Sequence, residues 1–468
     1  MEEKKLFING EFIDSTDQDW IQVENPRDKS IIGRVPAASE VDVNRAVQGA
    51  RGAQGPWQDL GLDQRIAFVE KMVAYLEDHR EEIAKTISLE LGCPLDFARN
   101  RQFMGYIDNM KDYISIAKAY PFVERKEGYE IHHEPVGLVA ALTPWNYPFG
   151  QIVKKVIPAL LTGSCVLLKP SKSTPLTAYY FAEAAKESQL PAGVFQLLPG
   201  RGGEVGNLLA RHPDINMISF TGSTQGGKEV AKLALDTVKR LTLELGGKSP
   251  ALLLPEGDID LCVKNVLDTV FLNAGQTCSA KTRLLAPRFL KAPLEVALVR
   301  EAKTYRFGDD RKGPVDVGPL QSAAQLAKVQ KYIALGKKEA KVLYEDSLDL
   351  DYGYYQGPVI FTEVDPDSPL AQDEIFGPVL SVIYYESEEE AIEIANNSLY
   401  GLSGMIFGPR EEALRLAKKI KTGQLQINKG KFSQNAPFGG FKESGLGREG
   451  GRIGLEEYLE TKTIFIGD

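Results

Sequence analysis

The feature that most restricts the fold of this chain is an alternation of short apolar segments with amphipathic segments between residues 135 and 254. Short apolar strands separated by helices are typical of parallel βαβ units, because a parallel connection has to cross one face of the sheet. The region therefore predicts a doubly wound α/β sheet. The predicted strands are Val136–Leu142, Cys165–Leu168, Val194–Leu198, Ile215–Phe220 and Ala251–Leu254, and the predicted helices are 150–162, 174–189, 203–211 and 225–238.

A similar alternation in the second half of the chain predicts a second α/β domain, joined to the first by a hinge near 246–250. Upstream of the first sheet, apolar positions at helical spacing predict one long helix over 62–92, broken near His79. The elements predicted for the second domain are helices at 258–273, 320–336, 388–396 and 410–421 and strands at Val359–Phe361 and Val379–Tyr385.

The last segment, Tyr458–Ile466, alternates apolar and polar residues like an edge strand. An unpaired strand edge exposes a row of backbone hydrogen-bonding groups. We therefore expect this strand to find a pairing partner, with another subunit as one candidate.

Charge and cysteine content argue against several functional classes. The formal net charge of −9 disfavours nucleic acid as a partner, because such binding relies on clustered Lys and Arg. Four cysteines without a CxxC pair, and only four histidines, give no reason to expect a disulfide framework or a metal site. The start, MEEKKLFING, lacks the apolar core of a signal peptide, and no apolar run reaches the ~18 residues of a membrane span. We expect a reduced, cytoplasmic protein that binds neither nucleic acid nor membrane.

The loops that directly follow the predicted strands are the first candidates for a site, because ligands of open parallel sheets bind beyond the carboxyl ends of the strands. Four of these loops combine glycine or proline with polar residues. They are Thr143-Pro-Trp-Asn-Tyr-Pro148, Lys169-Pro-Ser-Lys172, Thr221-Gly-Ser-Thr-Gln-Gly-Gly227 and Glu244-Leu-Gly-Gly-Lys248.

The glycine-rich loop at 221–227 joins a strand to a helix, a place where backbone N–H groups and the helix N-terminus hold phosphate groups. Its GxxxxGK spacing matches part of a P-loop, but Glu229 stands where that motif needs Ser or Thr, which disfavours a kinase or ATPase. A literal GxGxxG string at 445–450 lacks a preceding strand, and the GxSxG motif of α/β-hydrolases does not occur.

Two residues in glycine-flanked segments are candidates for chemistry. Cys278 lies in the polar turn Gly275-Gln-Thr-Cys-Ser279, where a thiolate would be accessible, whereas the other three cysteines have apolar neighbours and are interpreted as buried. Glu244 ends an apolar strand, where burial would raise its pKa toward that of a general base. A structural carboxylate in an ion pair is the alternative interpretation of Glu244.

Six sequence strings, in the same order and at similar spacing, closely resemble the aldehyde dehydrogenase superfamily, and the resemblance extends over essentially the whole chain. The strings are Thr143-Pro-Trp-Asn-Tyr-Pro148, Phe220-Thr-Gly-Ser-Thr224, Leu243-Glu-Leu-Gly-Gly-Lys248, Gly275-Gln-Thr-Cys278, Glu374-Ile-Phe-Gly-Pro378 and Pro437-Phe-Gly-Gly-Phe-Lys-Glu-Ser-Gly445.

The resemblance implies NAD(P)-dependent oxidation of an aldehyde to its carboxylic acid. Cys278 would be the nucleophile that forms a thiohemiacetal, and the Asn146 amide with the Cys278 backbone N–H would form the oxyanion hole. Loss of hydride to the nicotinamide would leave a thioester, which water activated by Glu244 would hydrolyse. Two alternatives remain: an enzyme that passes the acyl group to coenzyme A, and a non-catalytic relative. Relatives that use coenzyme A commonly lack this glutamate, so the presence of Glu244 disfavours the first alternative.

The resemblance also implies where NAD or NADP would bind. In many NAD-preferring relatives a glutamate at the position of Lys172 bonds the adenosine ribose; because a lysine would instead attract a 2′-phosphate, we expect NADP to be used at least as well as NAD. The alternative is that Lys172 points to solvent. The residues implied for the cofactor are Thr143, Pro144, Trp145, Lys169, Lys172, Gly202, Gly222, Ser223, Gly227, Leu245, Glu374 and Phe376.

A substrate channel is implied on the other side of the cysteine. Lys154 stands where relatives often carry an aromatic or apolar residue, which hints at an anionic or polar aldehyde; a solvated charge is the alternative. The residues implied for the channel are Tyr147, Gln151, Lys154, Thr277, Ser279 and Phe438.

The fold implied is α/β in three parts, with the terminal strand helping to form a homodimer or homotetramer. A Rossmann-like doubly wound cofactor domain would comprise 1–115 and 135–246, and a catalytic domain 247–445. A small β-flap for oligomerisation would comprise 116–134 and 446–468.

Overall fold

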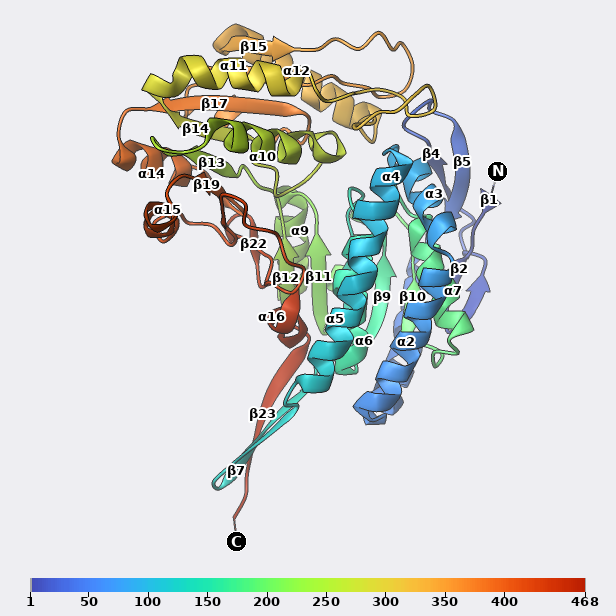
Figure 1. The fold of residues 1–468 in the computed structure, drawn as a ribbon. Helices are drawn as coiled ribbons and strands as arrows, with labels where there is room; N and C mark the ends of the chain where they lie inside the picture. The colour runs from blue at the N-terminus through green and yellow to red at the C-terminus, as the bar shows by residue number, and fades with distance from the viewer. Residues whose placement is uncertain (1, 468) are drawn as a thin grey trace.

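The structure is a computed structural model that describes residues 2–467, and it consists of two α/β lobes with a projecting β arm (Figure 1). The first lobe is built on an eight-stranded sheet of order β22-β12-β11-β8-β9-β10-β2-β3. Its five central strands are parallel, and the hairpin β2–β3 and the short β22 close its edges in antiparallel pairing. The strands are β22 Gly445–Leu446, β12 Arg240–Glu244, β11 Met217–Thr221, β8 Leu138–Leu142, β9 Cys165–Lys169, β10 Phe195–Leu197, β2 Leu6–Ile8 and β3 Glu11–Ile13.

The register of this sheet brings the ends of its strands level. Thr221 at the end of β11 lies opposite Glu244 at the end of β12, and Leu142 lies opposite Lys169. The loops after these strands therefore emerge at one edge, as the doubly wound topology predicts.

Helices pack around the first sheet. The predicted break near His79 is confirmed, because α2 ends at Asp78 and α3 begins at Arg80. Helix α6 is buried at every position, which explains its almost continuous apolar sequence. The helices are α1 Glu40–Asp59, α2 Leu62–Asp78, α3 Arg80–Leu91, α4 Leu95–Phe97, α5 Gly105–Ala119, α6 Pro148–Thr162, α7 Thr177–Glu187, α8 Asn207–Arg211 and α9 Thr224–Leu235, with π-helical turns η1 Ala98–Met104 and η2 Gly202–Gly206.

The second lobe contains a seven-stranded sheet of order β15-β16-β17-β14-β13-β19-β20. The predicted strand at 251–254 belongs here, as β13, so the alternating stretch 135–254 divides between two sheets after β12. The strands are β13 Pro250–Leu253, β14 Arg283–Pro287, β15 Lys341–Glu345, β16 Val359–Thr362, β17 Val379–Tyr385, β19 Met405–Phe407 and β20 Gln426–Ile427. The helices are α10 Ile259–Phe271, α11 Lys291–Ala302, α12 Ala323–Glu339, α13 Pro369–Gln372, α14 Glu388–Asn396 and α15 Arg410–Ala417, with 3-10 turns η3 Leu272–Gly275 and η4 Arg288–Leu290.

The arm is a three-stranded antiparallel sheet that projects from the first lobe and carries the C-terminus (Figure 1). Its strands are β6 Val123–Lys126, β7 Tyr129–Pro135 and β23 Leu459–Phe465. The terminal strand is thus paired within the chain, on one edge, with β7. The arm also contains fewer residues than predicted. Residues 116–119 belong to helix α5. Helix α16, Gly451–Glu456, packs against α5 and α6 and not in the arm.

Two small sheets complete the fold: β1 Glu2–Glu3 with β4 Trp20–Glu24 and β5 Ile31–Pro36, and β18 Tyr400–Gly401 with β21 Phe441–Lys442. Within residues 2–467 no helix has the length and apolar character to cross a membrane. The same residues contain no group of three or more His, Cys, Asp or Glu side chains arranged to hold a metal ion.

Candidate functional site

A cleft lies beyond the ends of the strands of the first sheet and is closed on its far side by residues of the second lobe. Loops after β8, β11 and β12 contribute one wall, and the turn of Cys278, helix α12 and the loop before β17 contribute the other. The lining residues are Pro144, Trp145, Asn146, Gln151, Thr221, Gly222, Ser223, Leu245, Gly246, Cys278, Gln325, Lys328, Glu374 and Phe376.

The turn from β11 to α9 presents the N-terminus of α9 to this cleft. Ser223 is the N-cap, and its Oγ accepts a hydrogen bond from the Gly226 N–H at 3.1 Å. Beside it the buried Thr221 Oγ1 has no hydrogen-bond partner within the described chain. Gly227 lies against the side chain of Leu245, where a methyl group would come within 2.4 Å. The turn therefore offers free donors and the positive end of a helix to a phosphate group.

The lysine of the partial P-loop match is occupied elsewhere. Lys228 Nζ forms an ion pair with Glu443 at 2.8 Å on the surface. It is not available to hold a nucleotide phosphate as a P-loop lysine does, which agrees with the mismatch at Glu229.

Lys169 ends β9 and is buried below the cleft edge. Its Nζ donates to the carbonyl oxygens of Pro170 at 2.7 Å and Gly200 at 3.3 Å. Burial, with a smaller contribution from the charge of Lys172, lowers the pKa of Lys169 to about 8. An ammonium group has three donors, so one remains for a ligand. Lys172 itself is exposed.

The remaining residues predicted for the cofactor differ in position. Thr143 continues the β8 edge, where its N–H donates to the Lys169 carbonyl oxygen at 3.1 Å. Gly202 is exposed in the turn η2, with open space where a side chain would lie. The structure places Thr143, Lys169, Lys172, Gly202 and Gly227 outside the lining of the cleft.

Glu374 and Phe376 form the opposite wall. Glu374 Oε1 accepts a hydrogen bond from the Gly247 N–H at 2.9 Å, and burial raises the pKa of the carboxyl. Phe376 has a left-handed backbone, with φ of 61°, and its ring meets that of Trp145 edge to face at 5.5 Å. Gln325 holds this backbone by donating to the Phe376 carbonyl oxygen at 2.7 Å.

Sequence reasoning missed Gln325 and Lys328, both on α12. The helix itself was predicted, but nothing in its pattern indicates which face meets a loop more than 40 residues away. That Gln325 and Lys328 share the cleft with Glu374 and Phe376 is known only from the folded chain.

The turn before Cys278 has an unusual backbone. Asn273, Ala274 and Gly275 are all left-handed, with φ values of 52°, 56° and 76°. This conformation costs about 1–2 kcal/mol for a residue such as Ala274, and strain of this kind gathers at functional sites. At Gly275 a methyl group would lie 2.1 Å from the Gly377 carbonyl oxygen, so only glycine fits against the Phe376 loop.

Hydrogen bonds fix the strained turn to the loop of Asn146. Asn273 Nδ2 and Gln102 Nε2 donate to the Asn146 carbonyl oxygen, at 3.0 Å and 2.9 Å. The Asn146 amide donates in return to the Gln276 carbonyl oxygen at 3.0 Å. A side-chain amide has two N–H donors, so this bond leaves one for a ligand beside Cys278.

Cys278 differs from the other cysteines in its accessibility. Cys93, Cys165 and Cys262 are buried, as predicted, whereas Cys278 is half-buried and lines the cleft. Burial, followed by the negative charge of Glu374, raises the pKa of the Cys278 thiol to about 12. The resting group is therefore a thiol, and it needs a proton acceptor before it can act as a nucleophile.

Glu244 is only 2% exposed, and neither of its carboxyl oxygens has a hydrogen-bond partner within residues 2–467. Burial, followed by the charge of Glu449, raises its pKa well above the usual range. Gly439 lies against the carboxyl, where a methyl group would come within 2.6 Å of Oε1. The absence of partners argues against the structural, ion-paired interpretation and favours a general base.

Comparison with known proteins gives this geometry its context. The sequence profile of the aldehyde dehydrogenase family matches residues 12–464. The chain belongs to this family. A putative aldehyde dehydrogenase of Staphylococcus aureus is 38% identical over 465 residues, with 98% of each chain covered, and one of Staphylococcus haemolyticus is 38% identical over 463 residues, again with 98% of each covered.

Solved structures agree in fold. Aldehyde dehydrogenase C of Pseudomonas syringae, a cysteine-to-alanine mutant in complex with NAD+ and octanal, has a TM-score of 0.96 and 39% identity, covering 99% of this chain and 96% of that one. An aldehyde dehydrogenase of Mycobacterium tuberculosis complexed with NAD+ has a TM-score of 0.96 and 36% identity, covering 100% and 99%. The α/β fold of this aldehyde dehydrogenase, predicted from the sequence, is confirmed.

Of the residues predicted for the substrate channel, Gln151 lines the cleft together with Cys278. Tyr147 and Thr277 share a hydrogen bond between their hydroxyl groups at 2.9 Å. Lys154 is buried with its Nζ 4.4 Å from the centre of the Phe438 ring. Ser279 is half-buried next to the cysteine.

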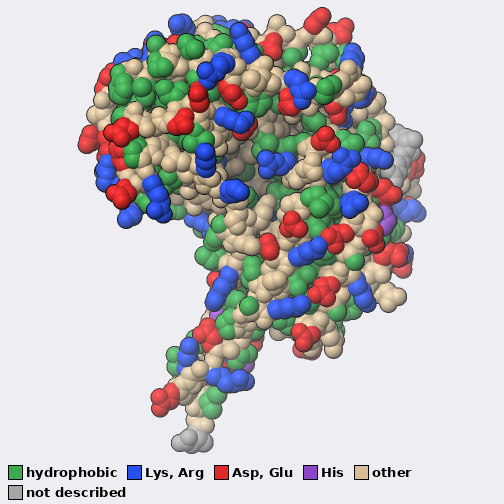
Figure 2. Space-filling model, in the orientation of Figure 1, with side chains coloured by type: hydrophobic (Ala, Val, Ile, Leu, Met, Phe, Trp, Pro, Cys, Tyr) green, Lys and Arg blue, Asp and Glu red, His purple; other side chains and the backbone are tan. Residues whose placement is uncertain are grey.

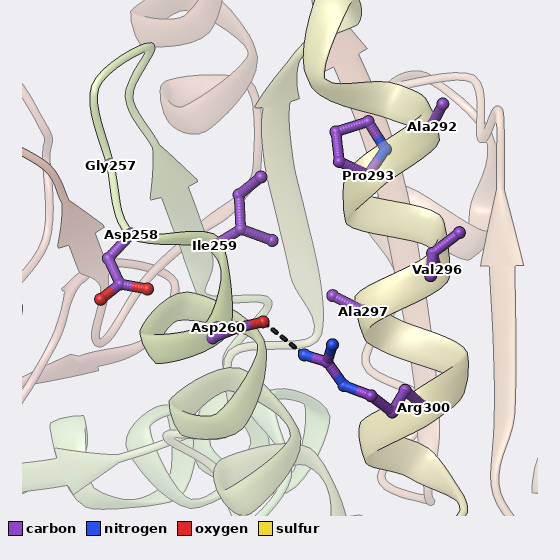
Figure 3. A pocket seen from close by; sticks show the side chains of 9 residues that line it. All are labelled: Gly257, Asp258, Ile259, Asp260, Ala292, Pro293, Val296, Ala297 and Arg300. Atoms are coloured by element: carbon purple, nitrogen blue, oxygen red, sulfur yellow. Dashed lines mark hydrogen bonds and ion pairs between the residues drawn. The ribbon is translucent and has the colours of Figure 1, made fainter.

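A second hollow, on the surface of the second lobe, is a weaker candidate. It lies between the start of α10 and helix α11, and its lining includes Pro293, Val296 and Ala297 (Figure 3). Its Asp260 and Arg300 form an ion pair with each other, so their charges are already satisfied. Its lining has neither a cysteine nor a buried polar atom without a partner, so it offers no group that could carry out aldehyde oxidation.

Proposed function

We propose that this enzyme oxidises an aldehyde to the carboxylic acid, with Cys278 as the nucleophile and Glu244 as the general base. One observation carries the proposal: the half-buried Cys278 lies close enough to the buried Glu244 carboxyl, which has no partner among the described residues, to be affected by its charge. A buried polar group without a partner is costly, so its retention points to a use in chemistry.

In the first step Glu244 takes the proton of the Cys278 thiol through a water molecule and passes it on to solvent, and the sulfur forms a bond to the aldehyde carbon. The electron pair of the carbonyl π bond moves to the oxygen, which gives a thiohemiacetal. The free N–H of Asn146 and the backbone N–H of Cys278 stabilise this oxyanion, an interaction whose loss typically costs ~10²–10³ in rate.

The residues that line the cleft, together with Lys169 below its edge, fit a nicotinamide dinucleotide. The N-terminus of α9 with Ser223 suits the pyrophosphate, and Lys169 and Glu374 supply a donor and an acceptor for the two riboses. Trp145 and Phe376 give a wall of aromatic rings at the other end. When bound, the nicotinamide accepts the hydride that leaves the substrate carbon, so that a thioester remains on Cys278.

In the last step Glu244 takes a proton from a water molecule, and the hydroxide oxygen bonds to the thioester carbon. The carbon–sulfur bond breaks, Cys278 leaves as a thiolate, and the acid is released. Because Glu244 is present, we favour hydrolysis over transfer of the acyl group to coenzyme A.

The test is formation of NADH and NADPH by purified protein with a panel of aldehydes, with identification of the acid. We expect turnover for the wild type and a loss of at least ~10³-fold in Cys278→Ser, because the nucleophile is gone. Undiminished turnover in that variant, or a product other than the acid, would contradict the proposal.

We also propose that NADP is used at least as well as NAD. Lys172 is exposed, carries no ion pair in the described chain, and its charge reaches Lys169, the proposed ribose contact. A 2′-phosphate on that ribose would meet a positive field. The proposal fails if catalytic efficiency with NAD exceeds that with NADP at least tenfold and Lys172→Glu leaves the ratio unchanged.

Finally, we propose a homodimer or homotetramer assembled through the arm. Strand β23 pairs with β7 on one edge only, and Ile464, Phe465 and Ile466 expose apolar side chains at the end of the arm. Thr463→Pro, which removes an edge donor, should give monomers in light scattering. An oligomer of unchanged mass would count against the arm as the interface.

A further inference from the structure

Two adjacent lysines on α6 have opposite environments. Lys155 is fully buried and forms an ion pair with Glu449. Lys154 is also buried, at 5% exposure, but it has no ion pair and no hydrogen bond within residues 2–467. Its ammonium group lies over the face of the Phe438 ring, with Nζ 4.4 Å from the ring centre.

A largely buried ammonium group without a carboxylate is expensive, because much of its hydration is lost and a ring face replaces only part of it. Removing the charge would make α6 easier to bury, and α6 is otherwise almost entirely apolar. The unmet charge therefore indicates a negative partner that arrives with a ligand.

The position of Lys154 tells which ligand that is. It follows Gln151 by one helical turn, and residues three apart share a helix face, so Lys154 lies on the side of α6 that meets the cleft. Its charge is felt by both Cys278 and Glu244, the two proposed reacting groups. A ligand group beside Lys154 is therefore a short distance from the aldehyde carbon.

A second cation lies nearer the surface on the same side. Arg101, in the π-helical turn η1, is exposed, has no ion pair among the described residues, and its charge reaches Tyr147, the neighbour of Thr277. Figure 2 shows a hollow between the two lobes with Lys and Arg side chains at its rim. A positive entrance raises the local concentration of anions.

We propose that the substrate is an aldehyde that carries a carboxylate a few carbons from the carbonyl group, and that Lys154 binds this carboxylate. Arg101 attracts it at the entrance. The inference rests on the proposed aldehyde oxidation, and the reaction is the same: the aldehyde end becomes a second carboxylate while the first stays bound and unchanged.

A competing explanation is that Lys154 serves the chemistry directly, by stabilising the Cys278 thiolate or the Glu244 carboxylate. Its charge acts to lower the pKa of both groups. In that case every aldehyde would depend on Lys154 equally. The two explanations therefore differ in whether the effect of Lys154 depends on the charge of the substrate.

The experiment compares linear ω-oxo carboxylates of three to six carbons with the ω-oxo carboxamides of equal length, which have the same shape and no charge. For the wild type we expect kcat/KM to be at least tenfold higher for the best carboxylate than for its amide. In Lys154→Met this ratio should fall at least tenfold, chiefly through KM, and in Lys154→Arg most of it should remain. Lys338→Met, which removes an exposed charge on α12, is the control and should keep the wild-type ratio.

Three results overturn the inference: a wild type that does not distinguish acid from amide, an equal loss for both substrates in Lys154→Met, or a fall in the ratio with Lys338→Met as large as with Lys154→Met. If Lys154→Met fails to fold, the wild-type ratio and Lys154→Arg still decide. Failure of the proposed function looks different, because the wild type would then oxidise neither substrate.

Discussion

Two buried glutamates near the end of the first sheet differ in their partners: Glu449 forms an ion pair, whereas Glu244 has no hydrogen-bond partner among the described residues. Glu449 and Glu244 are each 2% exposed. Glu449 forms an ion pair with Lys155, whose Nζ also donates to Ser219 Oγ at 3.3 Å, and Tyr458 donates to the same oxygen at 3.1 Å. Glu244 has no such partner in the described residues. Burial alone thus does not mark a reactive group; a buried carboxyl with no partner at either oxygen is the stronger candidate.

The charge of Glu449 also affects Glu244. The negative charge of Glu449 is the second-largest cause, after burial, of the raised pKa of Glu244. Glu449, which is paired with Lys155 and does not line the cleft, therefore helps to raise the pKa of Glu244 toward that of a general base.

The largest expected effect is on activity, in Glu244→Gln. Loss of a general base typically costs ~10²–10⁴ in rate, so turnover should fall by that factor. Stability should move the other way. The folded pKa of Glu244 is raised, so above pH ~4.5 the folded state holds a proton that the unfolded state has lost, and stability falls as pH rises.

Glutamine removes this penalty, so thermal unfolding of Glu244→Gln at pH 8 should occur at the wild-type temperature or above it. If Glu244→Gln instead unfolds below the wild-type temperature, the loss of activity would follow from lower stability, and Glu244 would be a structural residue like Glu449.

The next effect is on stability, in Glu449→Leu. This change leaves the Lys155 ammonium buried without a counter-charge, which typically costs about 3–5 kcal/mol. The double variant Lys155→Met with Glu449→Leu removes both charges and should recover most of the loss, as measured by urea unfolding. If the double variant is no more stable than the single one, the ion pair does not explain the burial of Glu449.

The smallest expected effect concerns the cysteines. With a pKa raised to about 12, Cys278 is a thiol at neutral pH, and its thiolate fraction rises about tenfold per pH unit. Alkylation by iodoacetamide should therefore accelerate about tenfold per unit between pH 7 and 9.

Peptide mass spectrometry should find the label on Cys278 and not on the buried Cys93, Cys165 or Cys262. A rate that is flat across this pH range, or a label that appears first on a buried cysteine, would contradict the assigned environments.

Much of the fold follows from local patterns. The short apolar strands with intervening helices predict the parallel sheet, and the loops after β8, β11 and β12 predict the cleft, because the strand ends of a parallel sheet share one edge. Cys278 and Glu244 are also recognisable from their neighbours in the sequence. Each is a polar residue close to glycines, which leave room for a ligand beside its side chain.

What the sequence does not predict depends on contacts between distant residues. The ion pair of Lys155 with Glu449 joins positions almost 300 apart, and the hairpin β2–β3 joins the sheet beside β10, about 190 residues later. The left-handed turn at Asn273–Gly275 is held by Asn146 from the other lobe, and Gln102 donates to the same Asn146 carbonyl oxygen. No periodicity within one segment carries that information.

The measurement that tests the central claim most directly is the mass of Glu244→Gln after mixing with the aldehyde and the dinucleotide. If Cys278 is the nucleophile and Glu244 activates the hydrolytic water, the acyl group should accumulate on the Cys278 peptide, with a burst of one reduced dinucleotide per site. An acyl group on a different residue, or steady turnover at the wild-type rate without a burst, would contradict the account.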